Sequence, residues 1–276
     1  MGDGSISVGP GCEPGAGVRM AKYGAVLITG ASSGIGRALA DACAAPGVTL
    51  HLCGRDAARL EATAAACRAR GATVLPAVLD IGDAAGMRAW IGGAGRLDLV
   101  VANAGIAAGN ADGALETPAQ TRQIFDVNVT GMLNTVLPAR EVLLAQAPGA
   151  DGWRGRIAVV ASVVAFVATP HAPAYAASKA AVDRWTVGIA HTARQQGVLV
   201  TSVCPGFVRT NMTAGNKFKM PGLMDAEQAA AIILRAVRKG RTRITFPWYM
   251  GVIGRLTALL PPRLFAAIAS RHVAGK

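Results

Sequence analysis

Tyr175 and Lys179 are the two residues whose types and spacing best suit proton transfer. They lie four positions apart in an alanine-rich segment, and on a helix that spacing places both side chains on one face. A free tyrosine has a pKa of about 10, and a neighbouring ammonium lowers it by about 1–3 units because it stabilises the phenolate. Such a tyrosine exchanges a proton with an alcohol or a carbonyl oxygen. The alternative is a solvated pair on a helix surface. Whether the surrounding elements form a cofactor site distinguishes the two interpretations.

A glycine-rich turn near the start of the chain is the first of those elements. The apolar run Ala25–Thr29 predicts a buried strand, and a helical pattern follows from Ile35 to Ala45. Glycines let a backbone approach a pyrophosphate closely, and a helix N-terminus offers it free N–H groups. We therefore expect a dinucleotide site here rather than an ordinary tight turn. The residues expected to hold the dinucleotide are Gly30, Ser32, Ser33, Gly34, Ile35 and Gly36.

The end of the second predicted strand indicates which dinucleotide is bound. Val48–Cys53 is followed by Gly54 and Arg55, where many dinucleotide folds carry a carboxylate for the ribose. An arginine there attracts a 2′-phosphate, and the missing carboxylate removes a repulsion. We therefore expect NADP(H) in preference to NAD(H), with further cofactor contacts from Ser32 or Ser33 and from Arg37. The alternative is that Arg55 caps a solvated turn.

Small and polar residues also follow the later predicted strands, at the edge where open α/β sheets bind ligands. Asp80-Ile81 follow Thr73–Val78, Asn103-Ala104-Gly105 follow Leu97–Ala102, Ser162 follows Arg156–Ala161, and Pro205-Gly206 and Thr210 follow Leu199–Val203. Helical patterns at 56–70, 83–91, 117–146, 175–197 and 225–239 alternate with these strands, and a last strand is expected at Arg243–Phe246. This alternation predicts a single-domain, doubly wound parallel sheet of Rossmann type, with about seven strands and helices on both faces.

Two further features carry hypotheses about function. Asn128 lies inside the predicted helix Thr117–Gln146, where asparagine is unfavourable and its amide needs a partner. From the residue alone, a functional and a structural role are equally supported. The polar, irregular segment Asn211–Leu223 has the length and position of a substrate lid.

Taken together, these motifs resemble the short-chain dehydrogenase/reductase family from about Ala21 to Phe246. The motifs are TGxxxGxG from Thr29, Asn-Ala-Gly from Asn103, Asn128, Ser162, YxxxK from Tyr175, and Pro205-Gly206. The resemblance implies that Tyr175 is the acid/base and that Ser162 orients the substrate oxygen. It implies that Lys179 binds the nicotinamide ribose and lowers the tyrosine pKa, while Asn128 anchors a water in a proton relay. Besides the glycine turn, the expected cofactor contacts are Arg55, Asp80, Ile81, Asn103, Ala104, Gly105, Tyr175, Lys179, Pro205, Gly206 and Thr210.

The resemblance also implies an activity. The expected enzyme is an NADP(H)-dependent oxidoreductase that interconverts a secondary alcohol with a ketone or aldehyde (EC 1.1.1.-). Two alternatives stay open, a reductase of carrier-bound 3-oxoacyl groups and a dinucleotide-binding sensor or scaffold without catalysis. Relatives usually pair through helices equivalent to 117–146 and 175–197, so a homodimer or homotetramer is expected.

The composition limits the classes of partner that are expected. The net charge is +12, but the basic residues are scattered, so no clustered basic face for nucleic acid is expected. The five cysteines form no CxxC pair, which predicts free thiols in a reducing cytoplasm and no metal site. Neither a signal peptide nor an uninterrupted apolar stretch of about 18 residues is apparent.

The two ends of the chain differ from the rest. Residues 1–20 are rich in Gly and Pro and are expected to be a disordered leader before a catalytic domain at 21–249. Residues 250–276 form an amphipathic tail in which Leu256, Leu259 and Phe265 stand among arginines. The tail resembles those of family members with lipophilic substrates. We expect it to cover the domain or a dimer partner, and the less favoured alternative is contact with an anionic membrane surface.

Overall fold

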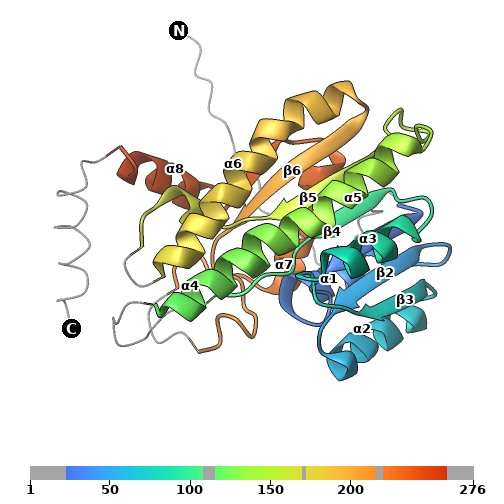
Figure 1. Ribbon diagram of the computed structural model, residues 1–276, viewed down its shortest axis with the longest axis horizontal. Coiled ribbons are helices and arrows are strands. Elements are labelled where there is room, and N and C mark those ends of the chain that lie inside the picture. Colours follow the sequence, from blue (N-terminus) through green and yellow to red (C-terminus); the bar gives the residue numbers. More distant parts are fainter. Residues whose placement is uncertain (1–22, 108–115, 170–171, 216–219, 260–276) are drawn as a thin grey trace, which may run out of the picture.

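The computed structural model describes residues 23–107, 116–169, 172–215 and 220–259 (Figure 1). Its centre is a seven-stranded sheet in the order β3-β2-β1-β4-β5-β6-β7, with every neighbouring pair parallel. The strands are β1 (Ala25–Thr29), β2 (Thr49–Gly54), β3 (Thr73–Val78), β4 (Leu99–Ala102), β5 (Gly155–Val160), β6 (Val198–Pro205) and β7 (Arg243–Phe246). The predicted fold class is confirmed.

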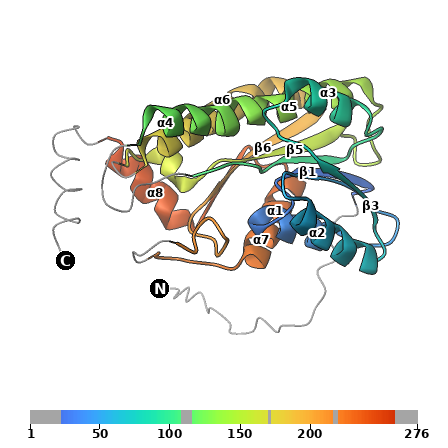
Figure 2. The same ribbon diagram turned by 60° about the horizontal axis from the view of Figure 1, so that its bottom comes forward.

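Helices cover both faces of this sheet (Figure 2). One face carries α1 (Gly34–Cys43), α2 (Ala57–Ala69) and α7 (Ala226–Arg238), and the other carries α3 (Ala84–Gly92), α5 (Gly131–Ala145) and α6 (Pro173–Gln195). Successive residues of β1 enter different cores, since Val26 and Ile28 pack in the cluster that holds Leu39 while Leu27 packs in the cluster that holds Met87. Because both faces are buried, the central strands are predominantly apolar, and this composition makes them recognisable in the sequence.

The single helix predicted over 117–146 is interrupted. It consists of α4 (Pro118–Phe125), a π-helical turn η1 (Asp126–Thr130) and α5. Asn128 lies in the π turn, which widens the helix locally and changes the direction of the side chain. A second small difference is that α6 begins at Pro173, so Tyr175 lies in the first turn rather than at the start.

The beginning of the tail is a helix, α8 (Trp248–Thr257), which runs across the expected boundary between residues 249 and 250. It packs on the domain through glycines: a Cβ at Gly251 would lie 2.5 Å from Thr245 Cγ2, and one at Gly254 would lie 2.9 Å from Phe166 Cβ. Its outward face exposes Val252, Ile253 and Leu256. The expected leader and residues 260–276 lie outside the described residues.

Among the described residues, every helix is too short or too polar to span a membrane. Cys43, Cys53, Cys67 and Cys204 are free thiols, and three of them are buried. In the same described part of the chain, His, Cys, Asp and Glu side chains form no group of three that would suit a metal ion.

Candidate active site

The site is built at the carboxyl ends of β1 and β4, which are neighbours where the strand order reverses. Thr29 Oγ1, at the end of β1, accepts hydrogen bonds from the N–H groups of Asn103 (3.1 Å) and Ala104 (3.2 Å). In return, Asn103 Nδ2 donates to the carbonyls of Thr29 (3.0 Å) and Gly30 (3.3 Å). Asn103 therefore ties the glycine turn to β4, and Thr29, which the sequence analysis did not single out as a site residue, is its anchor.

The glycine turn has the geometry that a pyrophosphate needs. Gly30 and Gly34 have positive φ angles of 68° and 53°. A Cβ at Gly36 would lie 2.2 Å from the Gly30 carbonyl oxygen, so the turn closes on α1 only without a side chain there. The N-cap of α1, Ser33, makes no capping hydrogen bond, whereas aspartates cap α2 and α3. The first N–H groups of α1 are thus left for an anion, and the residues present fit a dinucleotide.

The residues expected to select the cofactor gather at the tip of β2. Gly54 packs against Ser32, whose Oγ would lie 3.1 Å from a Cβ at that position. Arg55 Nη1 lies 3.8 Å from Asp80 Oδ2, and both side chains are more than half exposed. Asp80 Oδ1 accepts from the Gly82 N–H at 2.8 Å. Arg37, in contrast, pairs with Asp41 one turn further along α1 (3.7 Å).

Asn128 is buried and its amide is satisfied. Its Oδ1 accepts from the Ile106 N–H (2.8 Å), and its Nδ2 donates to the Ile106 carbonyl (2.9 Å) and to Ser178 Oγ (3.0 Å). Gly105 lies between this amide and Lys179: a Cβ there would be 3.0 Å from Asn128 Oδ1 and 3.3 Å from Lys179 Nζ. The π turn therefore places Asn128 near Lys179. Ser178 was not among the expected site residues, although its place on the buried face of α6, three residues after Tyr175, marks it as a candidate.

Lys179 is 5% exposed, and its Nζ donates to the Val160 carbonyl at the end of β5 (2.8 Å). Burial lowers the pKa of Lys179 from 10.5 to about 8. Its Nζ lies 5.9 Å from the centre of the Tyr175 ring. Burial raises the pKa of Tyr175 above its ordinary value, and a hydrogen bond with Ser162 opposes that rise only in part. The net shift of the Tyr175 pKa is upward because desolvation is its largest cause, and the lowering by Lys179 stays a prediction.

Ser162 and the residues after β6 complete the site. Ser162 Oγ accepts from the Val164 N–H (3.3 Å) and donates to the Pro205 carbonyl (3.5 Å). It thereby caps the 3-10 turn η2 (Val163–Phe166) and links the ends of β5 and β6. Thr210 reaches back to the glycine turn, where a Cβ at Gly34 would lie 2.9 Å from Thr210 Cγ2. The structure thus brings the predicted catalytic and nicotinamide-side residues to one edge of the sheet.

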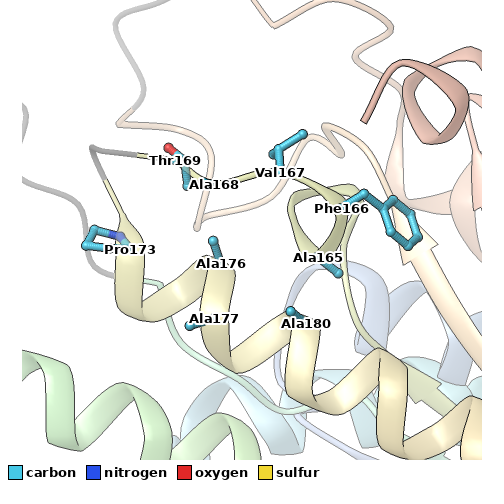
Figure 3. Close-up of a pocket in the computed structure, with 9 residues that line it drawn as sticks. All are labelled: Ala165, Phe166, Val167, Ala168, Thr169, Pro173, Ala176, Ala177 and Ala180. Atoms are coloured by element: carbon cyan, nitrogen blue, oxygen red, sulfur yellow. The ribbon is translucent and has the colours of Figure 1, made fainter. Parts of the chain in front are cut away.

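A pocket of about 380 Å³ lies between α6 and the segment that follows Ser162 (Figure 3). Figure 3 shows Ala176 and Ala180 pointing from α6 toward the loop, whereas Val167 points away from the helix. Its walls are Ala165, Phe166, Val167, Ala168, Thr169, Pro173, Ala176, Ala177 and Ala180. Apart from Thr169 these are apolar residues, and neither Ser162 nor Tyr175 is among them.

Glu116 is a second residue that the sequence analysis missed. Its Oε2 accepts from the Ala174 N–H (2.9 Å), directly before Tyr175, so it holds the start of α6. No local pattern predicts this contact, because the two residues are 58 positions apart. Of the expected lid Asn211–Leu223, residues 216–219 lie outside the described part. A parallel bridge between Val208 and Met224 flanks the lid.

Comparison with known proteins agrees with this geometry. The family model for short chain dehydrogenases matches residues 24–220. An uncharacterized oxidoreductase from Myxococcus xanthus is 37% identical over 257 residues, which cover 90% of this chain and 97% of that protein.

Solved structures of short-chain dehydrogenases are also similar to this chain. A Mycobacterium paratuberculosis short chain dehydrogenase bound to NAD is 27% identical with a TM-score of 0.70, and the match covers 80% of this chain and 95% of the other. A Sphingobium yanoikuyae short-chain dehydrogenase in complex with NADPH is 25% identical with a TM-score of 0.70, and the match covers 91% and 94%. With its glycine turn, its Ser162–Tyr175–Lys179 cluster and these similarities, the chain belongs to the short-chain dehydrogenase/reductase family of oxidoreductases.

Proposed function

We propose that this protein reduces a ketone or an aldehyde with NADPH, and oxidises the corresponding alcohol in the reverse direction. One observation carries the proposal: the Ser162 and Tyr175 hydroxyls and the Lys179 ammonium lie near one another at the sheet edge that also carries a glycine turn fitting a pyrophosphate. When bound, the nicotinamide cofactor supplies the hydride. The chain must then bind the carbonyl compound, stabilise the developing charge and deliver a proton.

Ser162 and Tyr175 have the positions for the last two tasks. Both hydroxyls are assigned as donors to the carbonyl oxygen, where negative charge develops during reduction. Tyr175 then gives its proton to that oxygen, and Ser162 keeps the oxygen in place. Burial raises the pKa of Tyr175, so the phenol is protonated before reduction begins and has a proton to donate.

Lys179 and Asn128 are assigned to the cofactor side and to proton supply. An ammonium has three N–H donors, and Lys179 gives one to the Val160 carbonyl. In the proposal the other two serve the nicotinamide ribose and a water-mediated path past Asn128 that restores the Tyr175 proton. The position of Gly105, between the Asn128 amide and the lysine, supports this path because a larger residue would block it.

The preference for NADP(H) remains part of the proposal, since relatives with NAD and with NADPH are both known. It is supported by the tip of β2, where Ser32 packs on Gly54 and Arg55 is exposed. A 2′-phosphate would find an available guanidinium and no carboxylate on the strand end itself. The Arg55–Asp80 contact, at 3.8 Å between exposed groups, is weak enough for a phosphate to displace.

The substrate is assigned as a small carbonyl compound with apolar substituents. The support is the pocket between α6 and the segment that follows Ser162, because its wall is almost entirely apolar. We also infer a homodimer or homotetramer that pairs through α4–α5 and α6, since Phe125 and Leu137 are exposed there (37% and 45%). A molar mass measured by light scattering tests the assembly.

The test of the proposed function is Tyr175→Phe, which removes the proton and leaves the ring. We expect kcat for carbonyl reduction to fall about 10³-fold, within the usual range for loss of an acid/base group. The NADPH Kd, measured by fluorescence titration, should stay within about threefold because the phenol is not the main binding contact. Tyr23→Phe is the matched control, since Tyr23 lies before β1 and its ring stacks with Arg156, away from the site. Full activity of Tyr175→Phe would disprove the proposed function.

A further inference from the structure

Arg243, on β7, contacts both chain segments that carry the proposed proton-transfer groups. One segment is α6, which carries Tyr175 and Lys179, and the other is η2, which Ser162 caps. The relative position of these two segments decides whether the Ser162 and Tyr175 hydroxyls can reach one carbonyl oxygen together.

The contact with α6 is an ion pair in which Asp183 is buried and Arg243 is partly exposed. Arg243 Nε lies 2.8 Å from Asp183 Oδ1, and Arg243 Nη2 lies 2.7 Å from Asp183 Oδ2, so the pair is bidentate. The Asp183 side chain is 2% exposed, and Ser202 Oγ on β6 also donates to it (2.7 Å). Asp183 follows Lys179 by four residues and therefore lies on the same face of α6, one turn further on. The ion pair thus fixes the catalytic face of α6 against β6 and β7.

The contact with η2 is a stack on Phe166, the last residue of that turn. The Arg243 guanidinium carbon lies 5.7 Å from the centre of the Phe166 ring, and that of Arg255, on α8, lies 4.4 Å from it. Gly254 lets α8 approach this closely, because a Cβ there would come within 2.9 Å of Phe166 Cβ. Phe166 is therefore held by two arginines, one from the sheet and one from the tail helix.

We propose that Arg243 is a positioning residue that sets the separation of Ser162 from Tyr175. It holds α6 through Asp183 and η2 through Phe166, and α8 secures the same ring through Arg255. The inference rests on the proposed function and adds to it how α6 and η2 are held in a fixed relative position. Because misplacement by about 1 Å costs about 10²-fold in rate, a loose link between these segments would reduce kcat without removing any catalytic group.

The competing explanation is that the ion pair only stabilises the fold. Removing one partner of a buried pair leaves an unpaired charge, so a single substitution cannot separate the two roles. Removing both charges avoids that penalty and is often neutral for stability. The discriminating variant is Asp183→Asn combined with Arg243→Met, which keeps an acceptor for Ser202 and a side chain of similar length beside Phe166.

For this double variant we expect a Tm within about 3 °C of wild type and an NADPH Kd within about threefold, but a kcat about 10- to 100-fold lower. Amide hydrogen exchange at residues 163–166 should be about tenfold faster, because η2 loses one of its anchors. The matched control is Arg156→Met, at a buried arginine of β5 that pairs with Asp151 (2.6 Å). It should leave both kcat and exchange at 163–166 unchanged.

A double variant that folds and keeps the wild-type kcat would overturn the proposal, as would unchanged exchange at 163–166. If the double variant does not fold, Phe166→Leu decides, since it keeps an apolar side chain but removes the ring that both arginines contact. It should lower kcat about tenfold and speed exchange at 163–166, and wild-type values for either would refute the inference. The exchange measurement needs no turnover, so this inference can fail while the Tyr175→Phe test succeeds, and the reverse.

Discussion

Lys179 is needed for the proposed reaction but should destabilise the fold at neutral pH. Its ammonium is buried with one carbonyl as hydrogen-bond partner, and burial lowers its pKa to about 8. Replacement by methionine keeps the length of the side chain and removes the charge. We therefore expect Lys179→Met to be inactive and, at pH 7, more stable than the wild type.

The size of the expected stability gain follows from the pKa shift of Lys179. Between 10.5 in the unfolded chain and about 8 in the folded protein, the difference corresponds to about 3 kcal/mol, at about 1.4 kcal/mol per pKa unit. Loss of the ammonium leaves the Val160 carbonyl without that donor, which costs about 1 kcal/mol. The net gain for Lys179→Met at pH 7 is therefore about 2 kcal/mol.

The stability difference between Lys179→Met and the wild type must change sign with pH. Below pH 8 the lysine is charged in both states, and the wild type bears the full cost of burying it. As the pH rises from about 8 to 10.5, the folded lysine is already neutral while the unfolded one still binds a proton, so wild-type stability rises. Above that range only the lost hydrogen bond remains, and Lys179→Met becomes the less stable protein.

Urea unfolding of both proteins without cofactor, from pH 7 to pH 10.5, measures this difference. Lys239→Met, at an exposed lysine that ends α7, is the control and should not change stability. A Lys179→Met variant that is less stable than wild type at pH 7 would refute the reasoning. So would a stability difference that does not depend on pH, because the burial cost must disappear when the ammonium is neutral.

Three further predictions concern the cofactor site and Asn128. Gly36→Ala should weaken NADPH binding about 100-fold or more in a fluorescence titration, because its Cβ would collide with the Gly30 carbonyl. Gly92→Ala, where a Cβ meets nothing within 4 Å, should bind normally. Arg55→Asp should lower the ratio of kcat/KM for NADPH to that for NADH about 100-fold, and an unchanged ratio would remove Arg55 from the selection of the cofactor. Asn128→Ala should cost about 2–3 kcal/mol in urea unfolding, because the Ile106 N–H and carbonyl lose their partner. A loss below about 0.5 kcal/mol would show that water replaces the amide.

Much of the fold could be predicted because the signals are local. The buried strands are mostly apolar, and the strands at Thr73–Val78 and Arg243–Phe246 have the predicted bounds. The order of strand, glycine turn and helix, and the place of Ser162 at a strand end, follow from the same patterns. Which residue stands at the end of a strand is a property of the chain alone, and parallel strands bring those ends to one edge.

The π turn at Asn128 shows where local patterns fail. Helical periodicity over 117–146 favoured one continuous helix, and it holds on both sides of the turn. At the π turn, Asn128 forms hydrogen bonds with Ile106, 22 residues earlier, and with Ser178, 50 residues later. Periodicity contains no information on such distant partners.

By itself, then, the sequence determined the fold class, the family and the identity of the proposed proton-transfer and phosphate-binding residues. Only the tertiary structure decided the state of those residues and what holds them in place. The pKa of Tyr175 is raised because the fold partly desolvates its phenol. Arg243 reaches Asp183 across 60 positions because the sheet places β7 beside β6, against which α6 packs. Residue types and their spacing are written in the chain, whereas burial and long-range pairing exist only once the chain is folded.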